Sequence, residues 1–254
     1  SVLASALAAF YMDIPVGHVE AGLRTGNIRN PFPEEMNRVV TSQLTRWHFA
    51  PTEFAADKLR AENYAEDSII VTGNTVIDAL HHVSAQQPEL GIDLPADRRL
   101  LLVTLHRREN FGEPLRRIID GLEQVLERHP DTQLLLPVHH NPNVRQVIQD
   151  RFGGRDRVTL CDPLEYTAFV AAMNRATLIL SDSGGVQEEA PALGKPVLVL
   201  RETPERPEAV VAGATRLVGT QTDQIVAAAD ELLTDADAYA AMARAHNPFG
   251  DGHS

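Results

Sequence analysis

Residues 176–200, ATLILSDSGGVQEEAPALGKPVLVL, limit what this chain can fold into more than any other stretch. Two apolar runs, at residues 178–180 and 197–200, flank a short helical segment. This pattern indicates a strand–turn–helix–strand unit, the building block of a parallel sheet. In the turn, Asp182 or Ser183 can cap the helix by accepting a hydrogen bond from one of its first backbone N–H groups.

The same turn also fits an anion site. Gly184 and Gly185 carry no side chain that would keep a ligand from the backbone. The first N–H groups of a helix and the positive end of its dipole attract anions. Glu188 and Glu189 follow a turn later, so a nucleotide would fit, with its diphosphate on the N–H groups and its ribose on a carboxylate. A plain capped helix after a buried strand fits these residues equally well.

Apolar runs alternate with helical periodicity along the whole chain, which predicts parallel sheets with helices on both faces. Residues 86–98 hold two prolines and a glycine and lack periodicity, which favours an inter-domain linker. We therefore expect two α/β doubly wound domains, at residues 1–85 and 99–254. The first has three predicted strands, at 14–19, 47–50 and 68–71, and opens on a helix at 1–12. We expect it to be incomplete at its N-terminus.

Composition excludes several classes of function. The 254 residues include 23 basic and 35 acidic side chains, and the net charge of −12 argues against nucleic-acid binding. The single cysteine, Cys161, excludes an internal disulfide and a cysteine metal cluster, and a reducing cytosol is the simplest location. No apolar run approaches the ~20 residues of a membrane span. We see no metal-ligand spacing and no GxGxxG, so neither a metal nor a nicotinamide cofactor is predicted.

Polar residues follow several predicted strands at the point where each strand ends. Glu20, His106 and His139 come directly after the runs at residues 14–19, 99–105 and 133–138. Ligands of parallel sheets bind beyond the carboxyl ends of the strands, so these side chains are candidates for a site. Glu34 begins a predicted helix, where stabilising the helix dipole is an ordinary alternative role. His106 can equally be a capping or core histidine, although Arg107 and Arg108 follow it on a polar loop.

Several long motifs give the chain a family resemblance. HVEAGLRTG (18–26), PFPEEMNR (31–38), TGNTVIDAL (72–80), TLHRRENFG (104–112), PVHHNPNV (137–144), SDSGGVQEEAPALGKPVL (181–198) and ERPEA (205–209) resemble the non-hydrolysing UDP-N-acetylglucosamine 2-epimerases. They cover nearly the whole chain in the same order. The resemblance implies two Rossmann-like domains, as in glycosyltransferase-B-like folds. It also implies a cytoplasmic homodimer without a cofactor that serves surface polysaccharide synthesis and interconverts UDP-GlcNAc and UDP-ManNAc.

The resemblance implies a route and assigns its residues. UDP leaves C1 as the C2 proton is removed, giving 2-acetamidoglucal, and then adds back. Such a route needs carboxylates at C2 and donors for the leaving diphosphate. The implied catalytic residues are Glu20, Glu34 and His106. The implied substrate-binding residues are Phe169 for uracil, Ser183, Gly184, Gly185 and Arg206 for the diphosphate, and Glu189 for the ribose. Arg107 and His139 match, less closely, a second UDP-GlcNAc site that activates the family's enzymes.

The resemblance also has a gap and leaves alternatives open. The family has a further segment upstream, with a Gly-rich phosphate loop and a GDT motif whose aspartate is catalytic, and this sequence starts after it. We therefore expect the first domain to be poorly stable and the turnover of the chain to be low. The alternatives are a UDP-sugar glycosyltransferase of the same fold, an inactive fragment that binds nucleotide sugars, and a hydrolysing relative that releases free ManNAc.

Overall fold

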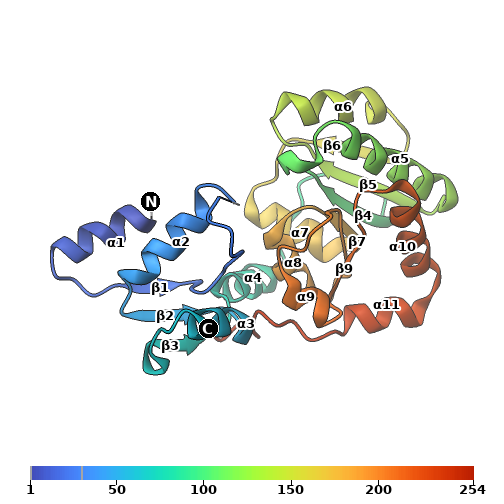
Figure 1. The fold of residues 1–254 in the computed structure, drawn as a ribbon. Helices are drawn as coiled ribbons and strands as arrows, with labels where there is room; N and C mark the ends of the chain where they lie inside the picture. The colour runs from blue at the N-terminus through green and yellow to red at the C-terminus, as the bar shows by residue number, and fades with distance from the viewer. Residues whose placement is uncertain (1, 30) are drawn as a thin grey trace. The chain divides into compact units, whose positions relative to one another are not determined.

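The computed structural model describes residues 2–29 and 31–254, which form two compact units (Figure 1). The first unit consists of Ser1–Ala79 with Pro248–Ser254, and the second of Leu80–Asn247. Each unit is an α/β structure built on one parallel sheet. Among the described residues, no helix is long and apolar enough to cross a membrane.

The first unit contains a three-stranded parallel sheet in the order β1-β2-β3. The strands are β1 (Gly17–Val19), β2 (Trp47–Ala50) and β3 (Ile69–Val71). The helices are α1 (Val2–Tyr11), α2 (Glu34–Gln43), α3 (Glu53–Ala61), the 3-10 turn η1 (Glu66–Ser68) and the first part of α4 (Thr75–Ala85). The helix predicted over residues 1–12 is present as α1, and its first residue lies outside the described part of the chain.

The core of the first unit is small. Its cluster of buried apolar side chains comprises Ala21, Ala50, Ala55, Ala56, Leu59 and Ile69, with Tyr64 packed against it. Most of the large apolar side chains that are exposed in the described chain also belong to this unit, among them Phe10, Tyr11, Met12, Val19 and Phe32. Little apolar surface is therefore removed from water in this unit.

The second unit contains a six-stranded parallel sheet in the order β6-β5-β4-β7-β8-β9. Its strands are β4 (Arg99–Thr104), β5 (Thr132–Pro137), β6 (Val158–Cys161), β7 (Ala176–Ser181), β8 (Val197–Val199) and β9 (Thr215–Leu217). Its helices are the rest of α4, then η2 (Arg108–Asn110), α5 (Glu113–Arg128), α6 (Pro142–Phe152), α7 (Tyr166–Arg175), α8 (Gly184–Ala192), α9 (Pro207–Val211), α10 (Thr222–Thr234) and α11 (Ala236–Ala243).

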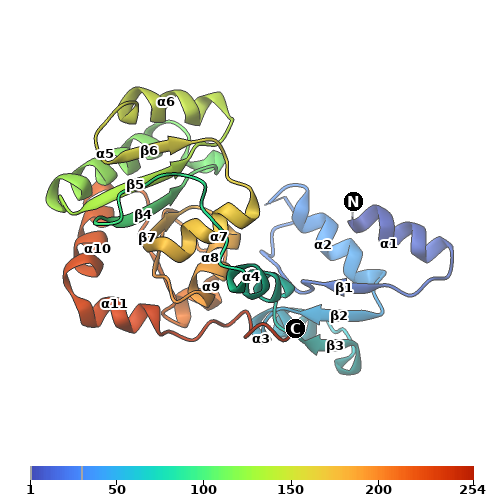
Figure 2. The ribbon, with the colours of Figure 1, turned by 180° about the vertical axis from the view of Figure 1, so that it is seen from behind.

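Helices cover both faces of the second sheet, as Figures 1 and 2 show. Successive side chains of a strand point to opposite faces. In β4, Leu101 and Val103 accordingly join the cluster that contains the buried side chains of α5 and α10. Leu100 and Leu102 join the cluster that contains those of α7 and α8. The predicted α/β class with parallel sheets is confirmed, and this unit has the expected doubly wound form.

The strand order places a topological switch point between β4 and β7. The chain runs from β4 outward to β5 and β6, then returns to the other side of β4 and continues through β7, β8 and β9. The loops that follow two such neighbouring strands lead in opposite directions and leave a crevice at the carboxyl ends of the strands. Open α/β sheets bind their ligands in this crevice. At this edge the Thr104 and Ser181 hydroxyls are hydrogen-bonded at 2.6 Å.

We predicted two domains, at residues 1–85 and 99–254, and this division stays a prediction. In the structure, residues 86–98 form no helix or strand and lie within the second compact unit, where Leu94 is buried in the core. The segment Pro248–Ser254 belongs to the first unit, and its Phe249 carbonyl accepts a hydrogen bond from Asn74 N at 2.7 Å.

Candidate functional site

In the first unit, the candidate carboxylate Glu20 lies on a tightly constrained turn after β1. Its φ of +63° is in the left-handed region, which a residue with a side chain rarely adopts. Gly22 follows with φ +87°, and a Cβ there would lie 2.2 Å from the Ala55 carbonyl oxygen of α3. Only glycine fits at this position, so the turn is held close to α3.

The loop after Glu20 is tied to the start of α2. The buried Glu35 carboxylate accepts hydrogen bonds from Thr25 N at 2.9 Å and Gly26 N at 3.0 Å. The preceding residue, Glu34, is the first residue of α2. These bonds fix the loop relative to the helix that carries the second candidate carboxylate.

Glu20 and Glu34 line one pocket of about 260 Å³ in the first unit. Sequence reasoning missed four polar residues that line it with them: His18, Asn37, Arg38 and Thr41. The spacing could have revealed two of them, because His18 is two residues from Glu20 along an extended strand and Arg38 is one helical turn after Glu34. Burial, and then the charges of His48, Arg24 and Arg38, lower the pKa of His18 to about 4, so His18 is neutral near pH 7.

In the second unit, the start of α8 lies directly beyond the carboxyl end of β7, beside the switch point. Ser183 is its N-cap residue, but the serine side chain makes no capping hydrogen bond. The Asp182 carboxylate accepts its hydrogen bonds from residues 106, 107 and 110. The expectation that Asp182 or Ser183 caps this helix is therefore wrong. The reason is that the loop after β4 lies close enough to offer Asp182 better donors.

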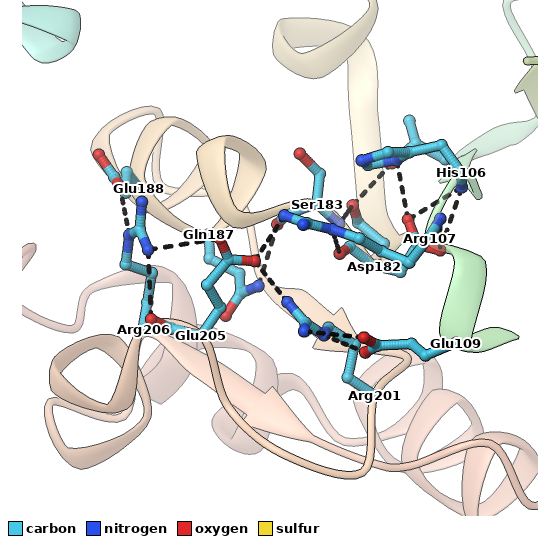
Figure 3. A network of polar contacts seen from close by, with 12 residues as sticks. His106, Arg107, Glu109, Asp182, Ser183, Gln187, Glu188, Arg201, Glu205 and Arg206 are labelled. Carbon is cyan, nitrogen blue, oxygen red and sulfur yellow. Dashed lines mark hydrogen bonds and ion pairs between the residues drawn. The ribbon is translucent and has the colours of Figure 1, made fainter. Parts of the chain in front are cut away.

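His106 is held against Asp182 (Figure 3). The imidazole Nδ1 lies 2.9 Å from Asp182 Oδ1, and the His106 side chain is 36% exposed while Asp182 is completely buried. Burial alone would raise the pKa of Asp182, but the hydrogen bond and charge of His106 and the N–H groups of Arg107 and His106 lower it overall. The carboxylate is thus ionised.

Three arginines converge on one carboxylate at the start of α8 (Figure 3). Arg107 Nη2 lies 2.5 Å from Glu205 Oε2, Arg201 pairs with the same oxygen, and Arg206 Nη1 lies 3.7 Å from Oε1. Burial alone would raise the pKa of Glu205, but these three charges lower it. The Glu205 carboxylate also touches the helix start, because a Cβ on Gly184 would lie 2.8 Å from its Cδ.

Each arginine also has a second partner. Arg201 Nε donates to Glu109 at 2.7 Å, and Arg206 Nε pairs with Glu188. Arg107 Nε donates to the Asp182 carbonyl at 3.2 Å. We call Arg107, Arg201 and Arg206 with the start of α8 the anion cradle. Sequence reasoning missed Arg201, whose only signal was its position on a loop directly after a strand.

The last candidates of the second unit lie on α7 and α8. Glu189, on α8, accepts a hydrogen bond at 2.9 Å from the hydroxyl of Tyr166, the first residue of α7. Burial and the charge of Glu188 raise the pKa of Glu189, and the tyrosine bond opposes them. Phe169 is partly buried against the core on the same helix, one turn after Tyr166. Tyr166 was not among the predicted site residues.

The candidates therefore form two groups. Glu20 and Glu34 come together in the first unit, and His106, Arg107, Ser183, Gly184, Gly185, Glu189 and Arg206 lie on the segments at the switch point of the second. The His139 ring lies 6.3 Å from that of His106, measured between centroids. Among the residues that the structure describes, no group of three or more histidine, cysteine, aspartate or glutamate side chains could hold a metal.

Comparison with known proteins gives consistent matches. A family model described as UDP-N-acetylglucosamine 2-epimerase matches residues 1–254. The UDP-N-acetylglucosamine 2-epimerase of Escherichia coli (strain K12) is 52% identical over 264 residues, covering 100% of this chain and 70% of that protein. The enzyme of the same name from Bacillus subtilis (strain 168) is 50% identical over 255 residues, covering 100% of this chain and 67% of that protein.

Solved structures agree with these matches. The crystal structure of the Neisseria meningitidis UDP-GlcNAc 2-epimerase bound to UDP-GlcNAc has 47% identity and a TM-score of 0.89, over 98% of this chain and 70% of that one. The Methanocaldococcus jannaschii UDP-GlcNAc 2-epimerase, in complex with UDP-GlcNAc and UDP, has 34% identity and a TM-score of 0.78, over 99% of this chain and 70% of that one.

Proposed function

Because this chain belongs to the UDP-N-acetylglucosamine 2-epimerase family, we propose that it interconverts UDP-GlcNAc and UDP-ManNAc. The observation that carries the proposal beyond the family match is the anion cradle at the switch point. Three arginines and a helix start surround a single carboxylate there. Such a site suits a pyrophosphate, since guanidinium groups and helix N-termini both bind phosphate oxygens.

The pyrophosphate takes the place of the Glu205 carboxylate in this proposal. Arg107, Arg201 and Arg206 would then contact its oxygens, with the backbone of residues 183–185 at the helix start. Glu189, oriented by the Tyr166 hydroxyl, accepts hydrogen bonds from the ribose, and Phe169 lies against the uracil. This arrangement keeps the nucleotide at the carboxyl ends of β4 and β7.

The reaction itself depends on acids and bases at C2 and on charge stabilisation at C1. The C2 proton has no neighbouring carbonyl to acidify it, so direct removal is unfavourable. Departure of UDP as the proton leaves gives 2-acetamidoglucal, and the reverse addition completes the epimerisation. Glu20 and Glu34 exchange the proton, and His106 stabilises the charge on the departing UDP. A proton is returned to C2 on the opposite face and UDP adds back to C1, so the route consumes no cofactor.

Four further proposals rest on the family resemblance. The enzyme is a homodimer, it works in the cytoplasm, and its product enters surface polysaccharide synthesis. Arg107 and His139 contribute to a second, activating UDP-GlcNAc site; this assignment competes with the role of Arg107 in the anion cradle. A variant of His139 alone would test the activating site without changing the anion cradle.

Product analysis tests the proposed function. The chain is incubated at high concentration with UDP-GlcNAc and no acceptor, under single-turnover conditions because we expect low turnover. The nucleotide sugars are then separated and identified by NMR. We expect UDP-ManNAc to appear and to approach a fixed ratio to UDP-GlcNAc. Glu34→Gln is expected to slow its formation by roughly 100-fold or more, as for loss of a general acid or base.

The same experiment separates the alternatives. Release of free ManNAc with UDP would indicate a hydrolysing relative. Turnover that appears only when an acceptor sugar is added would indicate a glycosyltransferase. Tight UDP binding without any product from UDP-GlcNAc would indicate a nucleotide-sugar-binding protein.

A further inference from the structure

Asp182 is a completely buried carboxylate whose two oxygens have different partners. Oδ2 accepts hydrogen bonds from Arg107 N at 2.9 Å and from Asn110 Nδ2 at 3.0 Å. Oδ1 lies 2.9 Å from the imidazole Nδ1 of His106, and His106 N is 3.1 Å from both oxygens. Both oxygens thus hold the loop after β4, and Oδ1 also contacts the His106 ring.

This geometry fixes the tautomer of His106. An ionised carboxylate only accepts hydrogen bonds, so Nδ1 must carry the proton that it shares with Asp182. Nε2 makes no hydrogen bond with any other residue in the described part of the chain. A neutral His106 therefore has its lone pair on Nε2, and a protonated His106 has an N–H there that can donate to a ligand.

We propose that Asp182 is a positioning residue that fixes the His106 ring with Nδ1–H toward its own carboxylate and Nε2 free for the departing UDP. The proposal rests on the proposed function, in which His106 acts on the pyrophosphate. In the protonated ring, Nδ1–H stays on Asp182 while Nε2–H donates to the departing UDP, whose charge the imidazolium neutralises.

Nitrogen NMR of the ¹⁵N-histidine-labelled full chain tests the tautomer without any need for turnover. The wild-type protein is expected to show neutral His106 as the Nδ1–H form. Detection of the Nε2–H form in the wild type would overturn the proposal. This measurement uses no variant, so it decides the question even if a change at the buried Asp182 prevents folding.

Asp182→Asn provides the second arm. Its amide oxygen can keep the bonds from Arg107 N and Asn110, while its NH₂ group faces Nδ1 and forces the proton onto Nε2. We expect the Nε2–H tautomer, because an Nδ1 that accepts from the amide cannot also carry a proton, and a kcat lowered by roughly 100-fold or more with KM changed less than threefold. Asp162→Asn is the matched control, since Asp162 is exposed and pairs with Arg145.

The outcomes separate this proposal from the proposed function. An unchanged tautomer of His106 in Asp182→Asn would overturn the positioning role, whatever the activity. A loss of activity that appears only in KM or in UDP binding would assign Asp182 to the structure of the loop and would also overturn it. If the tautomer changes as expected but the wild type forms no UDP-ManNAc, the geometry is right and the proposed function is wrong.

Discussion

At the scale of single residues, Glu205 is the side chain whose removal says most about the anion cradle. Its carboxylate occupies the place that we assign to the pyrophosphate, so it competes with the ligand. The three arginines keep Glu109, Glu188 and the Asp182 carbonyl as partners when Glu205 is neutral. The cradle should therefore persist without this carboxylate.

Glu205→Gln is accordingly expected to tighten UDP binding. Removing a competing negative charge from the site should lower the Kd of UDP by on the order of tenfold, and should leave the binding of uridine nearly unchanged. Isothermal titration calorimetry measures both. Glu202→Gln is the control, because Glu202 lies on the same loop but accepts its bonds from Thr220. Weaker UDP binding would mean that Glu205 is needed to hold the arginines in place.

His18 gives a prediction about pH. Its folded-state pKa of about 4 lies below the ordinary value of 6.5, because burial disfavours the charged ring. Between these values the unfolded chain binds a proton that the folded chain does not, so stability is highest above pH 6.5 and falls as the pH decreases toward 4. Partial exposure limits the loss to roughly 1 to 2 kcal/mol.

Chemical denaturation at several pH values checks this origin of acid sensitivity. His18→Gln should flatten the dependence of the unfolding free energy on pH in this window. Exposed His81→Gln should leave the dependence as in the wild type. An equal slope in wild type and His18→Gln would exclude His18 as its source.

At the scale of elements, the turn after β1 positions Glu20. Gly22→Ala places a Cβ 2.2 Å from the Ala55 carbonyl oxygen at a φ of +87°. A Cβ at Gly26 would meet no atom within 4 Å, so Gly26→Ala has only the backbone strain of a φ of +76°. We expect Gly26→Ala to cost about 1 kcal/mol and Gly22→Ala at least about 2 kcal/mol more, measured by urea denaturation. Equal costs would mean that the turn is not held against α3.

The sequence predicts where the strands and helices lie better than it predicts which strands pair with each other. Apolar runs such as residues 99–105 and 133–138 indicated β4 and β5, because buried parallel strands are continuously apolar. Nothing local to β4 or β7 indicates that they pair with each other, since their contact spans more than 70 residues of chain. The switch point, and with it the meeting of His106 and Asp182, was therefore outside the reach of pattern reasoning.

The same limit applies to the candidate site. The SDSGG turn pointed to an anion site because glycines before a helix have a local meaning. The role of Asp182 was assigned to the helix that follows it, whereas its partners come from a loop 72 to 76 residues away. Arg201 and Tyr166 became candidates only through their tertiary contacts, Arg201 with Glu205 and Tyr166 with Glu189.

At the scale of the whole molecule, the two units have very unequal cores. In the described part of the first, the buried apolar cluster is small and dominated by alanines, whereas both faces of the second sheet are packed with leucine, isoleucine and valine. Because hydrophobic stabilisation grows with the apolar area buried, the first unit should open more readily. Hydrogen exchange is expected to be faster for the amides of β2 than for those of β4. Equal protection would contradict this.

The central claim is that this chain moves a proton at C2 while UDP is detached from C1. Incubation with UDP-GlcNAc in deuterium oxide, followed by NMR of the recovered nucleotide sugars, tests it most directly. We predict deuterium at C2 in both epimers, with its uptake abolished in Glu20→Gln and greatly slowed in His106→Asn. Formation of UDP-ManNAc that retains its original C2 proton, or uptake at the wild-type rate in Glu20→Gln, would contradict the account.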